Sequence, residues 1–393
     1  RCAMLPCDDS LSPFAQVILT PEAWRRLDSN SNWVVHRRES VGDVKTWLDL
    51  AEENISLDSQ KLYHTQIIEP ETGASLLIIS VAHCICDGAS LEALMSDIAR
   101  RYAGLEPLPR QGIYEAVSDW ASNVNPETDN MWRESLKDWE TESFDALSGN
   151  GAKASDSEHG MVQHASDLSW QALEDKSRAL GTSPLSILQA SWSLLLQLFS
   201  EADTGDVVFG SVISGSHLPA HAPTFSVVPC RVALPETQTT SDLVNSLVSS
   251  SRLAQSHRHT SFGIFKTLPY STALALQAYP QSDDEEVPVP WTEIQNPAIR
   301  YDFAMFAEVL PRSTGQLDSM TFKLTYRGDA LSAPSATCIV RQFAALTETM
   351  LGSLPGEMAQ KLPARLPRNL LSAEGTVPAA KAEGIKDRAE LLH

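Results

Sequence analysis

Positive charge is scarce in this sequence. Its 393 residues include 30 Lys and Arg but 50 Asp and Glu, which gives a formal net charge of −20 at pH 7. A surface of this sign repels polyphosphate backbones, and no run of basic residues along the chain offsets it. We therefore expect no nucleic-acid partner.

Long apolar runs and clustered cysteines are also missing. No segment approaches the roughly 18 consecutive apolar residues of a membrane-spanning helix, and the N-terminus has no basic-then-apolar secretory signal. The six cysteines form no CxxC pair and no His/Cys cluster with zinc-ligand spacing; they are Cys2, Cys7, Cys84, Cys86, Cys230 and Cys338. We expect a cytoplasmic protein with reduced thiols, without membrane contact and without a metal site.

The composition is that of a folded protein. Hydrophobic residues make up 42% and charged residues 20% of the chain, within the range of globular proteins. The length exceeds what one hydrophobic core usually serves, so two lobes are expected. Strand and helix patterns alternate, which predicts an α/β or α+β fold. The predicted strands are Leu76–Val81, Val207–Ile213, Phe225–Leu234 and Phe322–Arg327, and the last predicted helix is Ala336–Leu351.

Two stretches of this pattern are informative in detail. Leu76–Val81 is a continuous apolar run, typical of a strand buried on both faces. A helix is predicted to follow it, with Ser90 as its N-cap. Thr182-Ser183-Pro184 supplies a cap and a first-turn proline for a second helix. That helix, predicted over 184–199, is apolar on nearly every side and should be buried.

A linker and a tail divide the chain. Residues 141–160 are rich in Ser, Gly, Ala and Asp and poor in large apolar side chains. We interpret them as a linker between an N-terminal lobe, residues 1–140, and a C-terminal lobe, residues 161–366. Residues 367–393 are rich in Ala, Glu and Lys without a clear core face, which predicts a peripheral or disordered tail.

His83 is a candidate catalytic group. It follows the predicted strand and precedes a turn at Asp87-Gly88 that leads into the helix. Imidazole has an unperturbed pKa near neutrality, so it can take a proton from an amine or an alcohol. A single histidine in such a place is more often a core residue bonded to a carbonyl group. Asp87 also has two interpretations: a general acid, or a carboxylate that holds the backbone of the turn. If buried, it would need a cationic partner.

Several segments resemble the condensation domains of nonribosomal peptide synthetases. Residues 80–90, which read Ser-Val-Ala-His-Cys-Ile-Cys-Asp-Gly-Ala-Ser, resemble the HHxxxDGxS active-site motif of that family. Three further segments follow in the family's order, and the resemblance covers residues 1–355. They are Met131-Trp132 with Leu136 and Trp139, then an Ala-Trp helix with Asp206–Gly210 and Ser214-Gly215, and finally Pro223–Val232, which resembles the Pro-x-Arg strand of fungal members.

The resemblance implies a fold of two lobes, each like chloramphenicol acetyltransferase, arranged in a V with a central tunnel. His83 matches the active-site histidine, and Gly88 matches the glycine whose amide can stabilise an oxyanion. Asp87 matches an aspartate in a structural salt bridge, for which we predict Arg231 as the partner. Arg231 stands alone in a buried-looking strand and would itself need a carboxylate. Candidate residues of the tunnel or its acceptor side are Ser90, Ser214 and Ser226.

The chain departs from the family pattern at four places. Ala82 replaces the first histidine of the motif, Ser216 replaces the arginine of a Ser-Gly-Arg segment, and Ser226 replaces an asparagine. Arg1-Cys2-Ala3-Met4-Leu5 resembles the family's Leu-Arg-Thr-x-Phe strand, which a first helix and strand normally precede. We therefore expect an N-terminal lobe that is truncated at its start and lacks part of the tunnel wall.

The resemblance further implies an acyltransferase. The donor would be a phosphopantetheine thioester on an acyl or peptidyl carrier protein, or an acyl-CoA, and the small-molecule acceptor would be an amine or a hydroxyl. No cofactor would stay bound, and the chain would act as a monomer in nonribosomal peptide or polyketide biosynthesis. Three alternatives stay open: a stand-alone CoA-dependent O-acyltransferase of a fungal metabolite, a catalytically silent binding or scaffold domain, and a rearrangement or cyclisation enzyme without a thioester.

Overall fold

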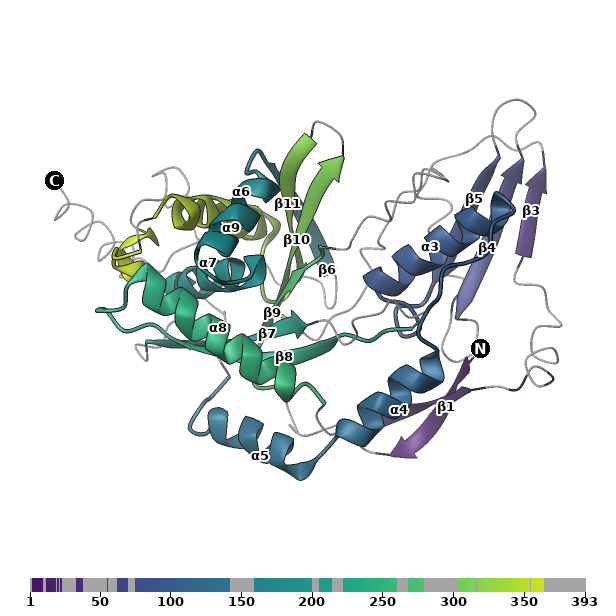
Figure 1. Ribbon diagram of the computed structural model, residues 1–393, viewed down its shortest axis with the longest axis horizontal. Coiled ribbons are helices and arrows are strands. Elements are labelled where there is room, and N and C mark those ends of the chain that lie inside the picture. The colour runs from purple at the N-terminus through teal and green to yellow at the C-terminus, as the bar shows by residue number, and fades with distance from the viewer. Residues whose placement is uncertain are drawn as a thin grey trace.

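The structure is a computed structural model that describes residues 2–9, 12–18, 20, 22, 33–37, 55, 62–69, 75–141, 159–199, 205–213, 222–259, 268–278, 303–314, 317–353 and 355–363. In Figure 1 the elements before residue 124 lie on one side of the molecule, and those after residue 158 lie on the other. The predicted mixed α/β fold of two lobes is confirmed.

The N-terminal lobe holds a small sheet. Strand β3 (Trp33–Arg37) runs parallel to β4 (Tyr63–Glu69), which pairs antiparallel with β5 (Leu76–Val81). The predicted strand over 76–81 is confirmed, but its burial on both faces is wrong. Leu76 is 39% and Leu77 is 42% exposed. The reason is that β5 is an outer strand of the described sheet, whose order is β3-β4-β5.

Two strands and two helices complete the described part of this lobe. Strands β1 (Cys2–Asp9) and β2 (Ser12–Ile18) form an antiparallel hairpin. Helix α3 (Gly88–Tyr102) follows β5 after a short turn, and α4 (Ile113–Asn123) leads towards the second lobe (Figure 1). The predicted helix after His83 is therefore confirmed.

The C-terminal lobe is built on a six-stranded mixed sheet of order β6-β11-β10-β9-β7-β8. Strand β9 is parallel to both of its neighbours, β7 and β10, and the other pairs are antiparallel. The predicted strands at 207–213, 225–234 and 322–327 correspond to β7, β8 and β11. The bounds are β6 (His159–Ser166), β7 (Asp206–Ile213), β8 (Ser226–Ala233), β9 (Thr272–Leu276), β10 (Met305–Thr314) and β11 (Leu317–Arg327).

Helices cover one face of this sheet and form the main core with it. Trp192 packs edge-on against Phe343, with ring centroids 5.1 Å apart, and Phe343 packs in the same way against Phe322 of β11. Trp192 is fully buried, which agrees with the predicted burial of its helix. The helices that share this apolar cluster are α6 (Trp170–Ala179), α7 (Pro184–Phe199), α8 (Thr240–Ser256) and α9 (Ala333–Gly352).

One segment of the predicted N-terminal lobe contacts the C-terminal lobe. Helix α5 (Pro126–Ser135) and the turn after it fall in the predicted N-terminal lobe, but they pack on the C-terminal one. Trp132 shares an apolar cluster with Ile213 and Val228, and Leu136 shares another with Val208. Strand β6 begins inside the predicted linker 141–160, whose residues 142–158 lie outside the described part. The predicted tail 367–393 lies outside it as well.

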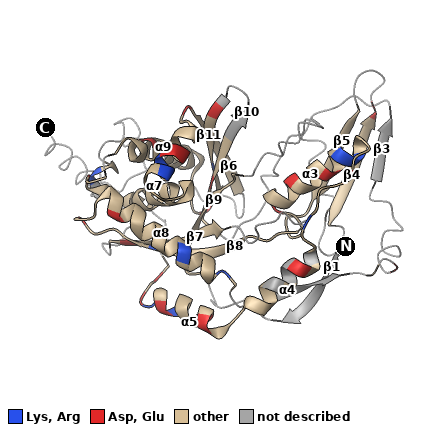
Figure 2. Cartoon of the chain, viewed as in Figure 1, with Lys and Arg blue, Asp and Glu red and all other residues tan. Residues whose placement is uncertain are grey.

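Basic and acidic residues are scattered over the described elements of both lobes (Figure 2). Arg100 and Arg101 occupy the last turn of α3, where basic side chains interact favourably with the negative end of the helix dipole. Within the described ranges, no helix is both long enough and apolar enough to cross a membrane.

Candidate active site

The start of α3 is fixed by a capping box. The Asp87 side chain accepts a hydrogen bond from the Ser90 amide at 2.8 Å, and Ser90 Oγ accepts one from the Asp87 amide at 2.6 Å. Such a reciprocal pair satisfies amides that have no partner inside the helix. The predicted N-cap is therefore wrong by three positions: Asp87 caps the helix and Ser90 completes the box. Ser90 is only 2% exposed, so its hydroxyl stabilises the turn and is not available to a substrate.

His83 lies in the turn between β5 and α3 and is exposed. Its Nδ1 is 2.7 Å from the carbonyl oxygen of Cys86. A carbonyl can only accept, so Nδ1 carries the proton and Nε2 of the neutral ring keeps its lone pair. The alternative was a core histidine bonded to a carbonyl group. The hydrogen bond to a carbonyl is present, but the residue is exposed and does not belong to the core. The arrangement leaves Nε2 able to take a proton from an approaching group.

Asp87 connects the two lobes through a backbone amide. Its Oδ2 accepts a hydrogen bond at 3.0 Å from the amide of Thr224, which lies just before β8. Asp87 is 9% exposed, and its two carboxylate oxygens accept one amide hydrogen bond from each lobe. Each carboxylate oxygen has an amide donor, so the hydrogen bonds of Asp87 do not depend on a nearby arginine. Of the two interpretations of Asp87, holding the backbone fits this geometry.

The predicted ion pair between Asp87 and Arg231 is not formed. Arg231 donates from Nε at 3.0 Å and from Nη2 at 2.8 Å to Oδ2 of Asp206. Strand pairing explains the choice: Arg231 on β8 lies opposite Val208 on β7, and Asp206 is two residues before Val208 on the same face. Nη1 of Arg231 also donates to the carbonyl groups of Ser135 and Lys137. Arg231 therefore fastens the segment after α5 to the C-terminal sheet.

Phe225 meets His83 across the lobes. The two ring centroids are 6.0 Å apart with an interplanar angle of 33°, and Phe225 is 39% exposed. Sequence reasoning did not single out Phe225 or Thr224, although both lie in the third family-like segment. Ser226 follows directly as the first residue of β8 and is partly buried. Ser214, the remaining candidate, lies outside the described residues.

A buried ion pair was also not predicted from the sequence. Nζ of Lys323 lies 2.5 Å from Oε2 of Glu308, directly opposite on the neighbouring strand, and both side chains are almost fully buried. Gln277 donates to the other carboxylate oxygen at 3.0 Å. Pairing and hydrogen bonding of this kind offset the high cost of burying two charges. Ala307 and Val309, on either side of Glu308 in β10, point into the helix-covered core. Side chains alternate along a strand, so Glu308 and Lys323 lie on the opposite face of the sheet.

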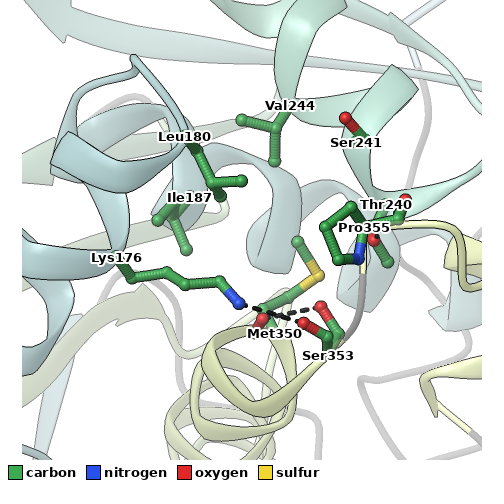
Figure 3. Close-up of a pocket in the computed structure, with 9 residues that line it drawn as sticks. All are labelled: Lys176, Leu180, Ile187, Thr240, Ser241, Val244, Met350, Ser353 and Pro355. Carbon is green, nitrogen blue, oxygen red and sulfur yellow. Dashed lines mark hydrogen bonds between the residues drawn. The ribbon is translucent and has the colours of Figure 1, made fainter.

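A surface hollow in the C-terminal lobe lies apart from these groups (Figure 3). Lys176 borders it and donates to the Ser353 carbonyl at 3.0 Å. The residues that line it come from α6, α7, α8, α9 and the segment after α9, so no residue of the His83 turn takes part. Within the described ranges, no group of three His, Cys, Asp or Glu side chains is arranged to hold a metal ion.

Comparisons with known proteins agree with the motif order. A family model described as "Condensation domain" matches residues 31–355. The chain is 29% identical over 346 residues to "Nonribosomal peptide synthetase fso1" of Omphalotus olearius, and 30% identical over 375 residues to "Nonribosomal peptide synthetase sidC" of Aspergillus fumigatus. These matches cover 86% and 90% of this chain but only 7% and 8% of the relatives, so the chain spans less than a tenth of their length.

A solved structure shares the fold. It is titled "Complex of the X-domain and OxyB from Teicoplanin Biosynthesis", with a TM-score of 0.64, 17% sequence identity, and coverage of 92% of this chain and 83% of the other. At this identity the likeness shows the fold alone. The family model, in contrast, spans most of the chain, from β3 through the His83 turn and β8 to the end of α9. On that match, this chain belongs to the condensation-domain family.

Proposed function

We propose that this chain transfers an acyl group from a pantetheinyl thioester to an amine or hydroxyl acceptor. One observation carries the proposal: His83 is exposed, and its Nδ1 bonds to the Cys86 carbonyl, so that Nε2 of the neutral ring keeps the lone pair that accepts a proton. A ring fixed by one nitrogen keeps its orientation when the other nitrogen takes up a proton. Such a group suits a reaction in which the nucleophile loses a proton as it attacks.

The proposed reaction has one addition and one elimination step. The acceptor nitrogen or oxygen attacks the thioester carbonyl carbon while His83 Nε2 takes its proton, and the carbonyl oxygen becomes an oxyanion. The tetrahedral intermediate then expels the thiolate, which recovers the proton from His83. Because the thioester is already an activated acyl group, no covalent bond to the enzyme is needed.

The first turn of α3 is the proposed site for the oxyanion. The amides at a helix start have no partner inside the helix, and the positive end of the helix dipole lies there. Asp87 uses the amide of Ser90, and the carbonyl of Asp87 accepts the amide of Leu91. Among the described residues, none accepts a hydrogen bond from the Gly88 amide. We assign the oxyanion contact to Gly88, as the motif implies.

The donor is proposed to be a thioester on a carrier protein, because the curated relatives that the chain matches are named as nonribosomal peptide synthetases. The product would accordingly belong to secondary metabolism. An acyl-CoA carries the same pantetheine arm, so a CoA-dependent O-acyltransferase would use the same groups. Product from the acyl-loaded carrier protein but not from the matching acyl-CoA would support the carrier-bound donor, and product from acyl-CoA alone would support the CoA-dependent enzyme.

The test is a transfer assay under single-turnover conditions with purified chain, an acyl-loaded carrier protein or the matching acyl-CoA, and an amine or hydroxyl acceptor. We expect product with wild type and a loss of about 10²–10⁴-fold in rate for His83→Ala. Cys84→Ala changes the exposed neighbour of His83 and serves as the matched control, which should stay close to wild type. Equal product from wild type and His83→Ala would overturn the proposal.

A binding role is the second candidate. The neighbour described above is an X-domain solved in a complex with OxyB, so a chain of this fold can serve as a binding partner of another protein. If this applies here, wild type and His83→Ala both yield no product, and both bind the same partner with equal affinity. The retained His83, Asp87 and Gly88 favour the acyltransferase.

A further inference from the structure

We propose that Phe225 limits the size of the acceptor that can reach His83. The inference rests on the proposed acyl transfer and adds a specificity-determining residue to it. Phe225 comes from the C-terminal lobe, whereas His83 and the helix start come from the N-terminal lobe. The acceptor would therefore be selected by a side chain that belongs to the opposite lobe from the base.

The geometry places the Phe225 ring beside the base. Its centroid lies 6.0 Å from that of the His83 ring, and the two planes are tilted by 33°. The Nδ1 edge of the imidazole is occupied by the Cys86 carbonyl at 2.7 Å. An acceptor that gives its proton to Nε2 must lie next to the imidazole, and the Phe225 ring, whose centroid is 6.0 Å from that of the imidazole, bounds part of the space left for its other groups.

Phe225 is fixed on both sides along the chain. The preceding amide, that of Thr224, donates to the Asp87 carboxylate, which itself caps α3. Two residues later Val227 packs against the cluster of Leu136, Val208 and Tyr270. The ring still keeps 39% of its surface exposed. A large apolar ring that is anchored but uncovered offers a wall for a substrate group, and its removal would open space rather than collapse the core.

The size of the effect follows from hydrophobic pockets in general. Such a pocket discriminates between groups that differ by one methylene by roughly 10–200-fold. Replacing phenylalanine by alanine frees more volume than one methylene. We therefore expect Phe225→Ala to raise kcat/KM for a bulky acceptor, relative to a small one, by at least about tenfold.

The test compares glycinamide and phenylalaninamide as acceptors with a fixed acyl-pantetheine donor. Phe225→Ala should raise the ratio of kcat/KM for phenylalaninamide over glycinamide about tenfold or more. Phe225→Tyr, which keeps the ring, should retain the wild-type ratio. Tyr102→Ala is the matched control, because this aromatic side chain is 89% exposed at the far end of α3. A ratio that is unchanged in Phe225→Ala would overturn the inference.

A second readout does not need turnover. The imidazole proton signals of His83, assigned by their loss in His83→Ala, are followed in NMR titrations with the same two amides. Phe225→Ala should shift these signals by removing the ring current, and it should lower the Kd for phenylalaninamide relative to glycinamide. If wild type forms no product, the proposed reaction fails, while this Kd ratio still decides the role of Phe225. Equal Kd ratios in wild type and Phe225→Ala would contradict it.

Discussion

The His83 turn and helix α7 are held in place by different kinds of contact. In the turn, short-range bonds dominate: His83 bonds to Cys86, and Asp87 and Ser90 bond to each other. Helix α7 has long-range apolar contacts to several strands and helices, and Trp192 is fully buried at its centre. The comparison teaches that the His83 turn is shaped mainly by bonds within a few residues, with two contacts from the other lobe, whereas the core around α7 depends on contacts between distant segments.

The largest expected difference between the two regions is in how much a substitution lowers the free energy of unfolding. Trp192→Ala removes a ring that has no exposure and packs edge-on against Phe343. We expect the free energy of unfolding to fall by about 3–5 kcal/mol, from the lost transfer energy and the cavity left behind. His83→Ala, at an exposed site, should change it by less than about 0.5 kcal/mol. Urea unfolding of both variants checks the contrast, and similar losses in the two would contradict it.

Asp87→Ala should have an intermediate effect, because this residue belongs to both kinds of contact. Loss of the N-cap costs about 1 kcal/mol, and the Thr224 amide left without its acceptor adds about 1 kcal/mol more. The acyl-transfer rate should fall as well, because the start of α3 and the position of Phe225 both depend on this carboxylate. Asp87→Asn keeps one acceptor oxygen and should lose less stability. An unchanged unfolding midpoint in Asp87→Ala would show that the cross-lobe bond does not form.

A smaller effect separates Asp206, the observed partner of Arg231, from Asp87, the predicted one. Its pair with Asp206 is partly exposed, at 35% and 23% of the side chains, so solvent weakens it. A double-mutant cycle with Arg231→Met and Asp206→Asn should give a coupling energy of about 1 kcal/mol or less. The same cycle with Asp87→Asn should give a value near zero. A larger coupling to Asp87 would restore the predicted ion pair.

The last prediction needs no substitution and compares the reactivity of two cysteines, one in each region. Cys84 is exposed in the His83 turn, whereas Cys230 is buried in β8. Burial raises the pKa of the Cys230 thiol to about 12, so at pH 8 it stays protonated and unreactive. We expect iodoacetamide to label Cys84 in the native chain and to leave Cys230 unlabelled until denaturant is added. Peptide mapping by mass spectrometry checks this, and equally fast labelling of both thiols would contradict it.

Local patterns were predicted from the sequence with the best success. The strand before His83, the helix after it and the buried helix over 184–199 could all be located from periodicity and capping residues. The partner of Arg231 could not, because a long connection joins β7 to β8 and leaves their register open. The exposed start of β5, at Leu76 and Leu77, was also missed, since an apolar run does not reveal whether its strand is central or outer. The position of Phe225 beside His83 could not be predicted either, because it depends on how the two lobes pack together.

The central claim is that the Cys86 carbonyl holds His83 in the tautomer with a free Nε2. The most direct measurement is the nitrogen NMR shift of the His83 ring at a pH where the imidazole is neutral, assigned by comparison with His83→Ala. The geometry predicts a protonated Nδ1 and an unprotonated Nε2. A protonated Nε2 in the free protein would contradict the account, because His83 could then not accept the proton of an acceptor.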